Sequence, residues 1–343
     1  MATDNFSSAS GPRPELSALL AGARVVSIPM RVRFRGILHR EALLIPWAAG
    51  WGEFSPFPEY DDAEAAPWLA AALEAAGEGY PEPVRTSVPV NGTVPAVAVD
   101  RVEAVLSRFG AVGTVKVKVA ERGQSVAEDL ARVAEVRRLL PNAGIRVDAN
   151  GGWDVPTAVA ALGALAEAGL EYAEQPVPDI AGLREVRQEL ARRDIPVLIA
   201  ADESVRKETD PLRVAREDAA DLIVVKVAPL GGVRRALEIV AAAGLPAVVS
   251  SALDTSVGIR AGVALAASLP ELPYACGLGT LSLMTGDVSG EPMLPDGGAL
   301  AVRNVPVSGE LLERYAAAPE RRQWWLDRLE RVYGQLMRGD RTA

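Results

Sequence analysis

From about residue 86 to residue 285 the chain alternates between short β-rich runs and helical stretches, and no other feature limits the possible folds as strongly. The runs are nearly continuous Val, Ile, Ala and Leu, whereas the helical stretches carry apolar residues three and four apart. This pattern is typical of parallel strands covered by helices. The strand candidates contain SVPVNG, TVKVKVA, IRVDAN, LEYAEQP, PVLIAADES, DLIVVKVAP, AVVSSAL and YACGLG.

Such candidates recur every 25 to 30 residues or so, which favours a (β/α) barrel over an open doubly wound sheet. No G-x-G-x-x-G follows the first candidate, and this argues against a dinucleotide-binding domain. Residues 1–86 are predicted to hold a disordered leader and a small α+β unit, with an alanine-rich helix over about 62–77. Residues 87–285 are predicted to form the barrel. Residues 286–343 show no strand rhythm, end in a helix and are expected to pack back onto the first unit.

Composition excludes several classes of protein. The net charge of −9 argues against binding to nucleic acid or anionic membranes, because both require a basic face. No apolar run reaches the ~20 residues that span a bilayer, and the first residues do not resemble a secretory signal. The single cysteine, Cys276, excludes an internal disulfide framework and a cysteine-based zinc site. We therefore expect a soluble, cytoplasmic protein.

Histidine and lysine are rare in this chain. The only histidine is His39, so a mechanism that needs a histidine pair or a Ser-His-Asp triad in the barrel is excluded. Of the 36 basic residues only four are lysines: Lys116, Lys118, Lys207 and Lys226. Arginine keeps its proton at any useful pH, whereas a desolvated lysine can lose it. The lysines are therefore candidates for proton transfer, except Lys207, which is expected at the surface.

The strand candidates end in ionisable residues. In a barrel, side chains at the C-terminal ends of the strands meet at one mouth, where the chemistry occurs. From the second to the sixth candidate these ends carry, in order, Lys116 and Lys118, Asp148, Glu174, Asp202, and Lys226. One polar strand end often only meets solvent. An ordered set in otherwise apolar strands predicts a catalytic site.

Three acids on adjacent strands offer hard oxygen ligands. With no histidine or cysteine nearby, we expect Mg²⁺, or Mn²⁺, with water and substrate oxygens completing an octahedral shell. Asp202 precedes Glu203, and adjacent strand residues face opposite ways, so only one is expected to be a ligand and Asp202 is preferred. Asn150 shares the face of Asp148 if the strand continues, and is otherwise a turn residue before two glycines.

Lys116 and Lys118 are two residues apart, so both side chains point to one face of the strand. Two partly desolvated ammonium groups so close together are expected to lower the pKa of at least one, which would make it a competent base. Lys226 enters from four strands away and approaches a bound substrate from the opposite side. A metal with lysines on two sides suits abstraction of a proton next to a carboxylate, because the cation stabilises the enediolate.

The motifs V-K-V-K-V, R-V-D-A-N-G-G-W, E-Q-P, A-D-E-S and V-V-K-V-A-P-L-G-G occur here in the order and spacing of the enolase superfamily, muconate-lactonizing-enzyme subgroup. The resemblance covers about residues 20–290 and implies an N-terminal capping domain and a modified (β/α)₇β barrel. It also implies that Asp148, Glu174 and Asp202 bind the metal. Lys118 is similar to the family's base, Lys116 to its partner and Lys226 to the lysine of the opposite face.

Within that subgroup the chain resembles the o-succinylbenzoate synthase family of menaquinone biosynthesis, through P-M-R-V-R-F-R-G-I, G-W-G-E-F-S-P-F-P-E-Y and S-S-A-L-D-T-S-V-G. The resemblance implies syn dehydration of 2-succinyl-6-hydroxy-2,4-cyclohexadiene-1-carboxylate. In that reaction Lys118 would remove the α-proton and then protonate the departing hydroxyl, while Lys226 would act by its charge alone.

The substrate implied by the resemblance is a small dicarboxylate. Arg31, Arg33 and Arg35 alternate on a segment expected to overhang the barrel mouth, where they either receive a carboxylate or form a solvated strand edge. Hydroxyl and backbone N–H groups are further candidate substrate contacts, or belong to ordinary tight turns: Ser250, Ser251, Gly277 and Gly279.

Other functions remain compatible with the same residues. An N-succinylamino-acid or dipeptide racemase, or a lactone cycloisomerase, would use the same lysines and metal. A dipeptide racemase is expected to hold an acid in the last barrel loop, and ACGLGTLSLM has none, although Asp254 could serve instead. A barrel that has lost catalysis and only binds a ligand is the third reading.

Overall fold

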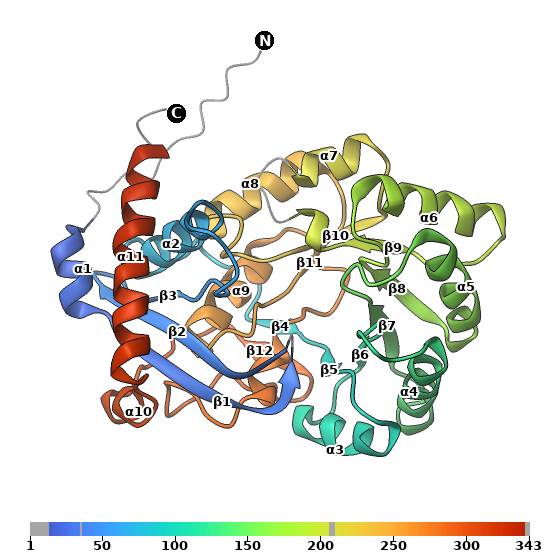
Figure 1. The fold of residues 1–343 in the computed structure, drawn as a ribbon, viewed down its shortest axis with the longest axis horizontal. Helices are drawn as coiled ribbons and strands as arrows, with labels where there is room; N and C mark the ends of the chain where they lie inside the picture. The colour runs from blue at the N-terminus through green and yellow to red at the C-terminus, as the bar shows by residue number, and fades with distance from the viewer. Residues whose placement is uncertain (1–13, 35, 206–209, 340–343) are drawn as a thin grey trace, which may run out of the picture.

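A computed structural model describes residues 14–34, 36–205 and 210–339 of the chain. Figure 1 shows two parts: an antiparallel sheet packed against helices, and a curled parallel sheet wrapped by helices. The expected disordered leader lies almost wholly outside the described ranges, as does Lys207. Among the described residues no helix is long and apolar enough to cross a membrane.

The N-terminal part is an antiparallel sheet in the order β1-β2-β3, with strands Arg24–Phe34, Ile37–Trp47 and Gly50–Phe54. Its helices are α1, Leu16–Gly22, and α2, Asp62–Gly77. The side chain of Asp61 accepts the backbone N–H of Glu64, and the Glu64 side chain accepts that of Asp61, so a capping box begins α2. The predicted helix over about 62–77 is therefore where the sequence placed it.

The second part is a parallel sheet in the order β11-β10-β9-β8-β7-β6-β5. Its strands are β5 Gly92–Val94, β6 Thr114–Lys118, β7 Gly144–Asp148, β8 Leu170–Glu174, β9 Ile199–Ala201, β10 Leu222–Val225 and β11 Ala247–Val249. The covering helices are α3 Val102–Leu106, α4 Val126–Leu139, α5 Val155–Leu165, α6 Ile180–Arg192, α7 Asp210–Arg216, α8 Val233–Ala243 and α9 Ser256–Ser268. This is the predicted alternation of strands and helices.

Residues 276–277 join the two edges of this sheet. Cys276 forms a parallel bridge with Val90, just before β5, and Gly277 forms one with Ser250, just after β11. The YACGLG run, predicted as the eighth strand, thus contributes isolated bridges rather than a strand. A Cβ on Gly277 would lie 2.5 Å from Ser250 Oγ, so the close approach at this seam requires glycine.

The ends of the barrel sequence differ from the prediction in detail. The SVPVNG run divides, because β4, Ser87–Pro89, pairs antiparallel with β12, Ala299–Ala301, and only the following residues enter the barrel as β5. The C-terminal segment was expected to contain no strand. The short β12 corrects that expectation. A three-residue strand whose partner lies about 200 residues away produces no recognisable alternation in its own sequence.

The last helices return to the N-terminal part. After α10, Gly309–Arg314, the helix α11, Pro319–Gly339, packs along α2 and also touches α1 and β1 (Figure 1). Buried Arg328 on α11 donates hydrogen bonds to three backbone carbonyls after β3, those of Pro56, Phe57 and Tyr60. Helix α11 thereby fixes the segment that leads from β3 to α2.

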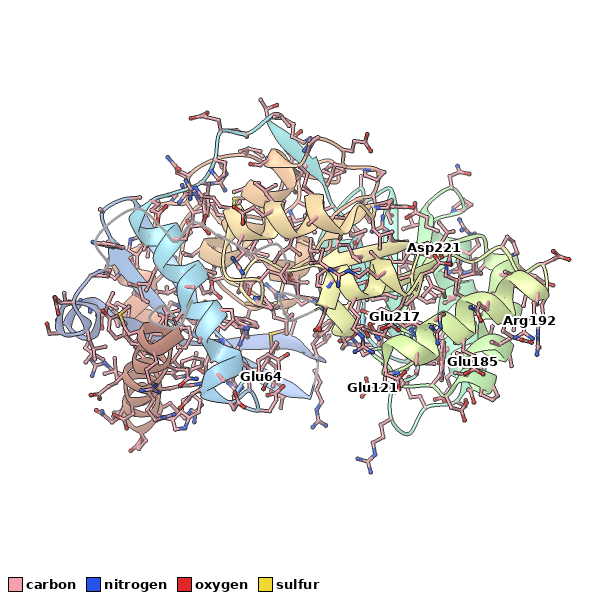
Figure 2. The ribbon with its side chains drawn as sticks, turned by 90° about the horizontal axis from the view of Figure 1, so that it is seen from above. Glu64, Glu121, Glu185, Arg192, Glu217 and Asp221 are labelled. Carbon is pink, nitrogen blue, oxygen red and sulfur yellow. The ribbon has the colours of Figure 1, made fainter. Side chains whose placement is uncertain are left out.

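Charge is distributed differently on the outside and inside of the barrel. Figure 2 shows charged side chains on the outer helices, such as Glu185 and Arg192 of α6, and both are exposed. The inward-facing residues of the middle strands are mostly apolar: Tyr172, Ala200, Leu222, Val224 and Val248 form one buried cluster. Arg146 of β7 is buried beside this cluster, with its guanidinium carbon 4.8 Å from the centroid of the Tyr172 ring.

Candidate active site

The strand register brings the predicted residues to one end of the barrel. Lys116 and Lys118 of β6 lie on one face of their strand, and Asp148 and Glu174 are the last residues of β7 and β8. Lys118 pairs with Asp148 across the sheet, and Asp148 pairs with Glu174. Parallel strands that end in register place these side chains together by geometry alone.

Each lysine of this group contacts a carboxylate. The closest pairs are Lys118 with Asp148 (Nζ to Oδ2, 2.5 Å), Lys116 with Glu174 (Nζ to Oε1, 2.9 Å), and Lys226 with Asp202. Lys116 also lies 3.1 Å from Asp148 Oδ2, so one ammonium group bridges two carboxylates. Asp202 and Lys226 directly follow β9 and β10, as predicted from the sequence.

These groups are buried, which strengthens their interactions. Asp148 and Glu174 are 0% and 1% exposed. Burial alone would raise the pKa of Asp148, but the ammonium groups of Lys118 and Lys116 hold that pKa well below its usual range. Burial and the neighbouring charge of Asp148 raise the pKa of Glu174 to about 8, despite Lys116.

The pKa of Lys116 is not lowered, as the proximity of Lys118 would suggest, but raised. Burial acts to lower its pKa, but Glu174 and Asp148 outweigh burial, and the pKa lies well above its usual value. The sequence shows that a second ammonium group is near Lys116, but not that carboxylates are nearer. Two carboxylates within 3.1 Å reverse the sign.

The donor set of Asp148, Glu174 and Asp202 fits a hard divalent cation, since all three supply carboxylate oxygens in a buried site. Within the described part of the chain, no three acidic, histidine or cysteine side chains stand ready in a metal-binding arrangement. The reason is visible in the contacts: lysine ammonium groups lie on the carboxylates. Their positive charge marks where a cation is favoured.

Asn150 and Glu203 also reach this site. Asn150 Oδ1 accepts from Lys118 Nζ at 2.7 Å, and its amide donates to Glu203 Oε1 at 3.1 Å. The backbone of Asn150 is left-handed, with φ of 46°, which asparagine tolerates better than most residues. Because β9 ends at Ala201, strand alternation no longer separates Asp202 from Glu203, and both line the same pocket.

The pocket above the carboxylates has about 450 Å³ of empty volume. Its lining includes Lys116, Lys118, Asp148, Asn150, Asp202, Glu203 and Lys226, together with Phe34, Thr93, Ser250, Ser251, Ala252, Leu253, Gly277 and Thr280. Phe34 comes from the capping sheet, and Lys118 Nζ lies 5.4 Å from its ring centroid. An aromatic ring over the lysine limits the access of water to it.

The three arginines predicted at the barrel mouth are placed differently from Phe34. Arg31 and Arg33 are exposed, on the strand face opposite Met30 and Phe34, and neither lines the pocket. Arg35 lies outside the described residues. The sequence shows that the arginines and the apolar residues alternate along this strand. It does not show which face of the strand meets the barrel.

The predicted hydroxyl and glycine contacts divide. Ser250, Ser251 and Gly277 line the pocket, whereas Gly279 does not. Ser251 Oγ lies 2.6 Å from Thr280 Oγ1 and donates to the carbonyl of Gly277. Thr93 and Thr280 also line the pocket but were not predicted, because neither is ionisable and neither is marked by a motif in the sequence.

Comparison with known proteins agrees with this architecture. A family model described as "Enolase C-terminal domain-like" matches residues 97–309, and one described as "Enolase N-terminal domain-like" matches residues 25–76. The solved 2-chloromuconate cycloisomerase from Rhodococcus opacus 1CP is similar in fold, with a TM-score of 0.73 and 22% identity over 87% of this chain and 98% of its own. A muconate lactonizing enzyme from Pseudomonas fluorescens gives 0.73 and 21%, over 86% and 98%.

Several curated relatives are much more similar in sequence. The o-succinylbenzoate synthase of Mycobacterium tuberculosis (strain ATCC 25618 / H37Rv) is 54% identical, over 94% of this chain and 97% of its own length. Those of Mycolicibacterium smegmatis and Thermobifida fusca are 55% and 54% identical, over 92% and 86% of this chain and 96% and 92% of their own lengths. The chain belongs to the enolase superfamily and, within it, to the family of the o-succinylbenzoate synthases.

Proposed function

We propose that this protein is a lyase that converts 2-succinyl-6-hydroxy-2,4-cyclohexadiene-1-carboxylate into 2-succinylbenzoate by syn dehydration. The observation that carries the proposal is the placement of Lys118 and Lys226. They pair with carboxylates on different strands, Asp148 and Asp202, and both line one pocket. The high identity to synthases over nearly the whole chain supports this substrate among those that the fold accepts.

Enolase-superfamily enzymes use a divalent metal, generally Mg²⁺, and in this chain Asp148, Glu174 and Asp202 would hold it. The bound ion supplies positive charge for the substrate carboxylate and for the enediolate that forms from it. Lys116 contacts two of these carboxylates and so orients them. It is thus a positioning residue rather than a base.

Lys118 acts as the base and then as the acid. Its amine takes the proton α to the ring carboxylate, and the electron pair of that C–H bond becomes part of the enediolate. The same ammonium group then gives the proton to the departing hydroxyl, so the C–O bond breaks and one water leaves. Asn150 and Phe34 hold the lysine side chain by a hydrogen bond and a ring face. A single group serves both steps because the two bonds lie on one face of the ring.

Lys226 stabilises negative charge on the opposite face without moving a proton. The hydroxyls of Ser250, Ser251 and Thr280 also line the pocket, where a substrate oxygen would accept a hydrogen bond in place of their present partners. This arrangement suits a small dicarboxylate, because cationic and hydroxyl groups line one pocket and both pair with carboxylate oxygens.

Racemisation of N-succinylamino acids is the second candidate function. It is favoured by one observation: lysines reach the pocket from two sides, and proton transfer on both faces of a carbon would require that. Dehydration needs proton transfer on one face only, so the two functions make different demands on Lys226.

The test is an ultraviolet assay of the purified protein with Mg²⁺ and the cyclohexadiene substrate, in parallel with polarimetry of N-succinyl-phenylalanine. Loss of the diene absorbance, abolished by EDTA and restored by added Mg²⁺, is the expected result. Fast racemisation with negligible dehydration would leave the assignments of the metal ligands and the lysines unchanged but would show that the substrate is an N-succinylamino acid.

A further inference from the structure

A second pocket lies on the other side of Lys226, between the capping sheet and the barrel. It shares Lys226, Ser250 and Ala252 with the substrate pocket, and its remaining lining includes the carboxyl groups of Glu53 and Asp254. Glu53 belongs to β3 of the capping sheet and is only 7% exposed. A buried carboxyl group outside the set of proposed metal ligands requires a structural explanation.

Glu53 forms hydrogen bonds with the first turn of the barrel helix α9. Its Oε2 accepts from the backbone N–H of Thr255 at 3.1 Å, from the Thr255 hydroxyl at 2.6 Å and from the backbone N–H of Gly258 at 3.0 Å. Its Oε1 accepts from Ser55 Oγ at 2.8 Å. The N-terminal N–H groups of a helix have no partner within the helix, and here the other domain supplies one.

Arg40 of β2 holds the preceding residues of the same loop. Its Nε donates to the carbonyl of Leu253 at 3.1 Å, and its Nη2 donates to the backbone and side-chain oxygens of Ser55. The guanidinium carbon lies 4.5 Å from the centroid of the Phe57 ring. Arg40 therefore holds the first part of residues 252–258, and Glu53 holds the second part.

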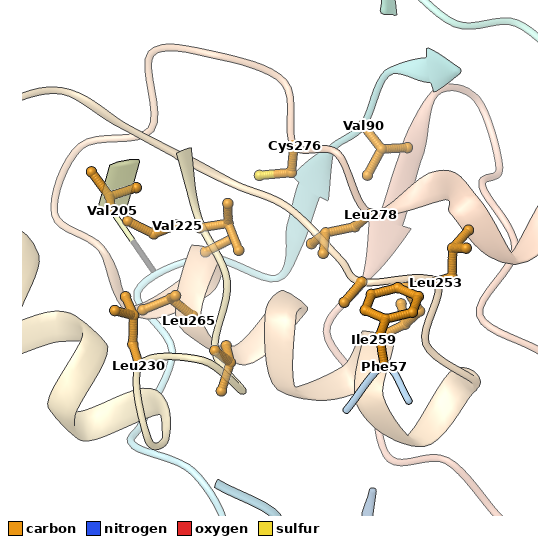
Figure 3. Packing of buried hydrophobic residues seen from close by; sticks show 14 of the residues in the cluster. Phe57, Val90, Val205, Val225, Leu230, Leu253, Ile259, Leu265, Cys276 and Leu278 are labelled. Carbon is orange, nitrogen blue, oxygen red and sulfur yellow. The ribbon is translucent and has the colours of Figure 1, made fainter. Parts of the chain in front are cut away.

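Leu253, whose carbonyl accepts from Arg40 and which precedes the residues held by Glu53, has an unfavourable backbone conformation. Its φ is +64°, a left-handed value that is strained for a residue with a Cβ. Its side chain is buried, lines the substrate pocket, and lies near Phe57 and Ile259 (Figure 3). Strained residues of this kind persist only where the surroundings hold them.

We propose that Glu53 and Arg40 of the capping domain are positioning residues that hold residues 252–258 in the conformation in which Leu253 forms a wall of the substrate pocket. The inference rests on the function proposed above only for the identity of the substrate. It assigns to the capping domain a second role besides covering the barrel: it determines the shape of a barrel loop through a helix N-terminus.

The chain contains a matched control. Glu74 of α2 makes the same kind of contact with the neighbouring barrel helix α8, because its carboxylate accepts the backbone N–H groups of Val233 and Arg234 at 2.6 and 3.1 Å. The residues before α8, from 227 to 232, do not line the substrate pocket. Loss of Glu74 thus removes an equivalent contact between the domains without touching the pocket wall.

The experiment compares Glu53→Ala with Glu74→Ala in the Mg²⁺-loaded enzyme. For Glu53→Ala we expect KM for the cyclohexadiene substrate to rise about tenfold with kcat within about twofold, and for Glu74→Ala both constants should stay within about twofold. Hydrogen exchange should accelerate at residues 252–258 in Glu53→Ala only. Because exchange is measured without substrate, it tests the loop even if the substrate assignment fails.

Equal KM changes in the two variants, or exchange that accelerates no more at 252–258 than elsewhere, would overturn the proposal. If Glu53→Ala does not fold, Glu53→Gln takes its place, since it keeps the shape and one acceptor oxygen. We then expect a smaller rise in KM with the same local exchange, and no change in either would count against the proposal.

A double-mutant cycle tests the strain itself. Asparagine accepts a left-handed backbone more readily than leucine, so Leu253→Asn weakens the need for external restraint. The KM effect of Glu53→Ala should be at least about threefold smaller in the Leu253→Asn background than in the wild type. Equal effects would show that the conformation of Leu253 is not what Glu53 maintains.

Discussion

Two sets of buried carboxyl groups lie on the two sides of Lys226, and they are stabilised by different partners. At the barrel mouth, Asp148 has two lysines within 3.1 Å, and its pKa is held well below the usual range against the effect of burial. At the domain interface, Glu53 accepts from backbone N–H and hydroxyl groups, and the charge of Arg40 offsets its burial in part. Burial and the charge of Asp254 raise its pKa to about 7.

The comparison shows that burial alone does not determine what a carboxyl group does. The two ammonium partners of Asp148 keep it charged and available to bind a cation, whereas the N–H and hydroxyl partners of Glu53 make it a structural acceptor between two domains. The first arrangement prepares a site that binds a cation, and the second holds a loop in one conformation. Each of the following variants removes one partner and so tests one side of the comparison.

The largest effect is expected from Lys118→Ala. Loss of the group that carries the proton should lower kcat by about 10⁴-fold, while Asp148 keeps Lys116 as a partner and the fold is retained. The measurement is kcat by the ultraviolet assay, with circular dichroism to check folding. Dehydration at more than about a tenth of the wild-type rate would show that the base is a different residue.

Lys116→Met should affect stability more than any other substitution at the mouth. It leaves Glu174, 1% exposed, without its ammonium partner, and removing one member of a buried pair costs about 3 kcal/mol. Urea unfolding in EDTA measures the loss. Added Mg²⁺ should recover part of it, because a cation replaces the missing charge; an equal loss with and without Mg²⁺ would contradict the assignment of Glu174 as a ligand.

Lys226→Arg and Lys226→Met separate charge from proton transfer. Arginine keeps the charge but cannot act as a base, so the arginine variant should lose about tenfold in kcat and the methionine variant about 100-fold or more. Both values come from the same assay. If the two variants are equally inactive and both remain folded, Lys226 transfers a proton, and the racemase reading gains support.

The smallest effect concerns the pH dependence of stability. The pKa of Glu53 is raised from 4.5 to about 7, so the folded protein binds the proton more tightly than the unfolded chain. The associated stability is present below pH 4.5 and is lost as the pH rises to about 7. Glu53→Gln, which cannot titrate, should flatten this decline by about 2 kcal/mol.

The charged groups facing Glu53 in this test come from other elements: Arg40 on β2, Asp254 in the loop before α9, and Tyr80 and Lys226, which line the same pocket. Burial raises the pKa of Asp254 as well, so part of the decline should remain in the Glu53→Gln variant. Urea unfolding at pH 5 and pH 7.5 gives the difference. Parallel curves for the two proteins would rule out Glu53 as the titrating group.

The barrel and its strand-end residues were predictable from the sequence because both depend on local patterns. Alternation fixes which residues of β6 face inward, and parallel strands bring their ends together. The pKa of at least one of Lys116 and Lys118 was predicted to be lowered, and that of Lys116 is instead raised, because the sequence does not give the distances to Glu174 and Asp148. Electrostatic signs depend on such distances.

Contacts between the domains were beyond sequence reasoning. Arg31 and Arg33 were predicted to contact the substrate because of their charge, yet Phe34 of the same strand lines the pocket. The pattern of alternation was correct, but the face that meets the barrel depends on how two distant segments dock. Glu53 and Arg40 were overlooked for the same reason, since their partners lie some 200 residues away.

The scarcity of lysine has a practical consequence for chemical labelling. Three of the four lysines line the substrate pocket, so nearly every side-chain amine of this protein belongs to the candidate active site. Amine-directed reagents usually decorate a protein surface at many positions, but here the surface offers arginine guanidinium groups, which do not react with them. Reductive methylation or an isotope-labelled acylating reagent therefore has few side-chain targets in this protein, and the buried, carboxylate-paired lysines of the pocket should react slowly. Conversely, immobilisation through amines is a poor way to attach this enzyme to a support.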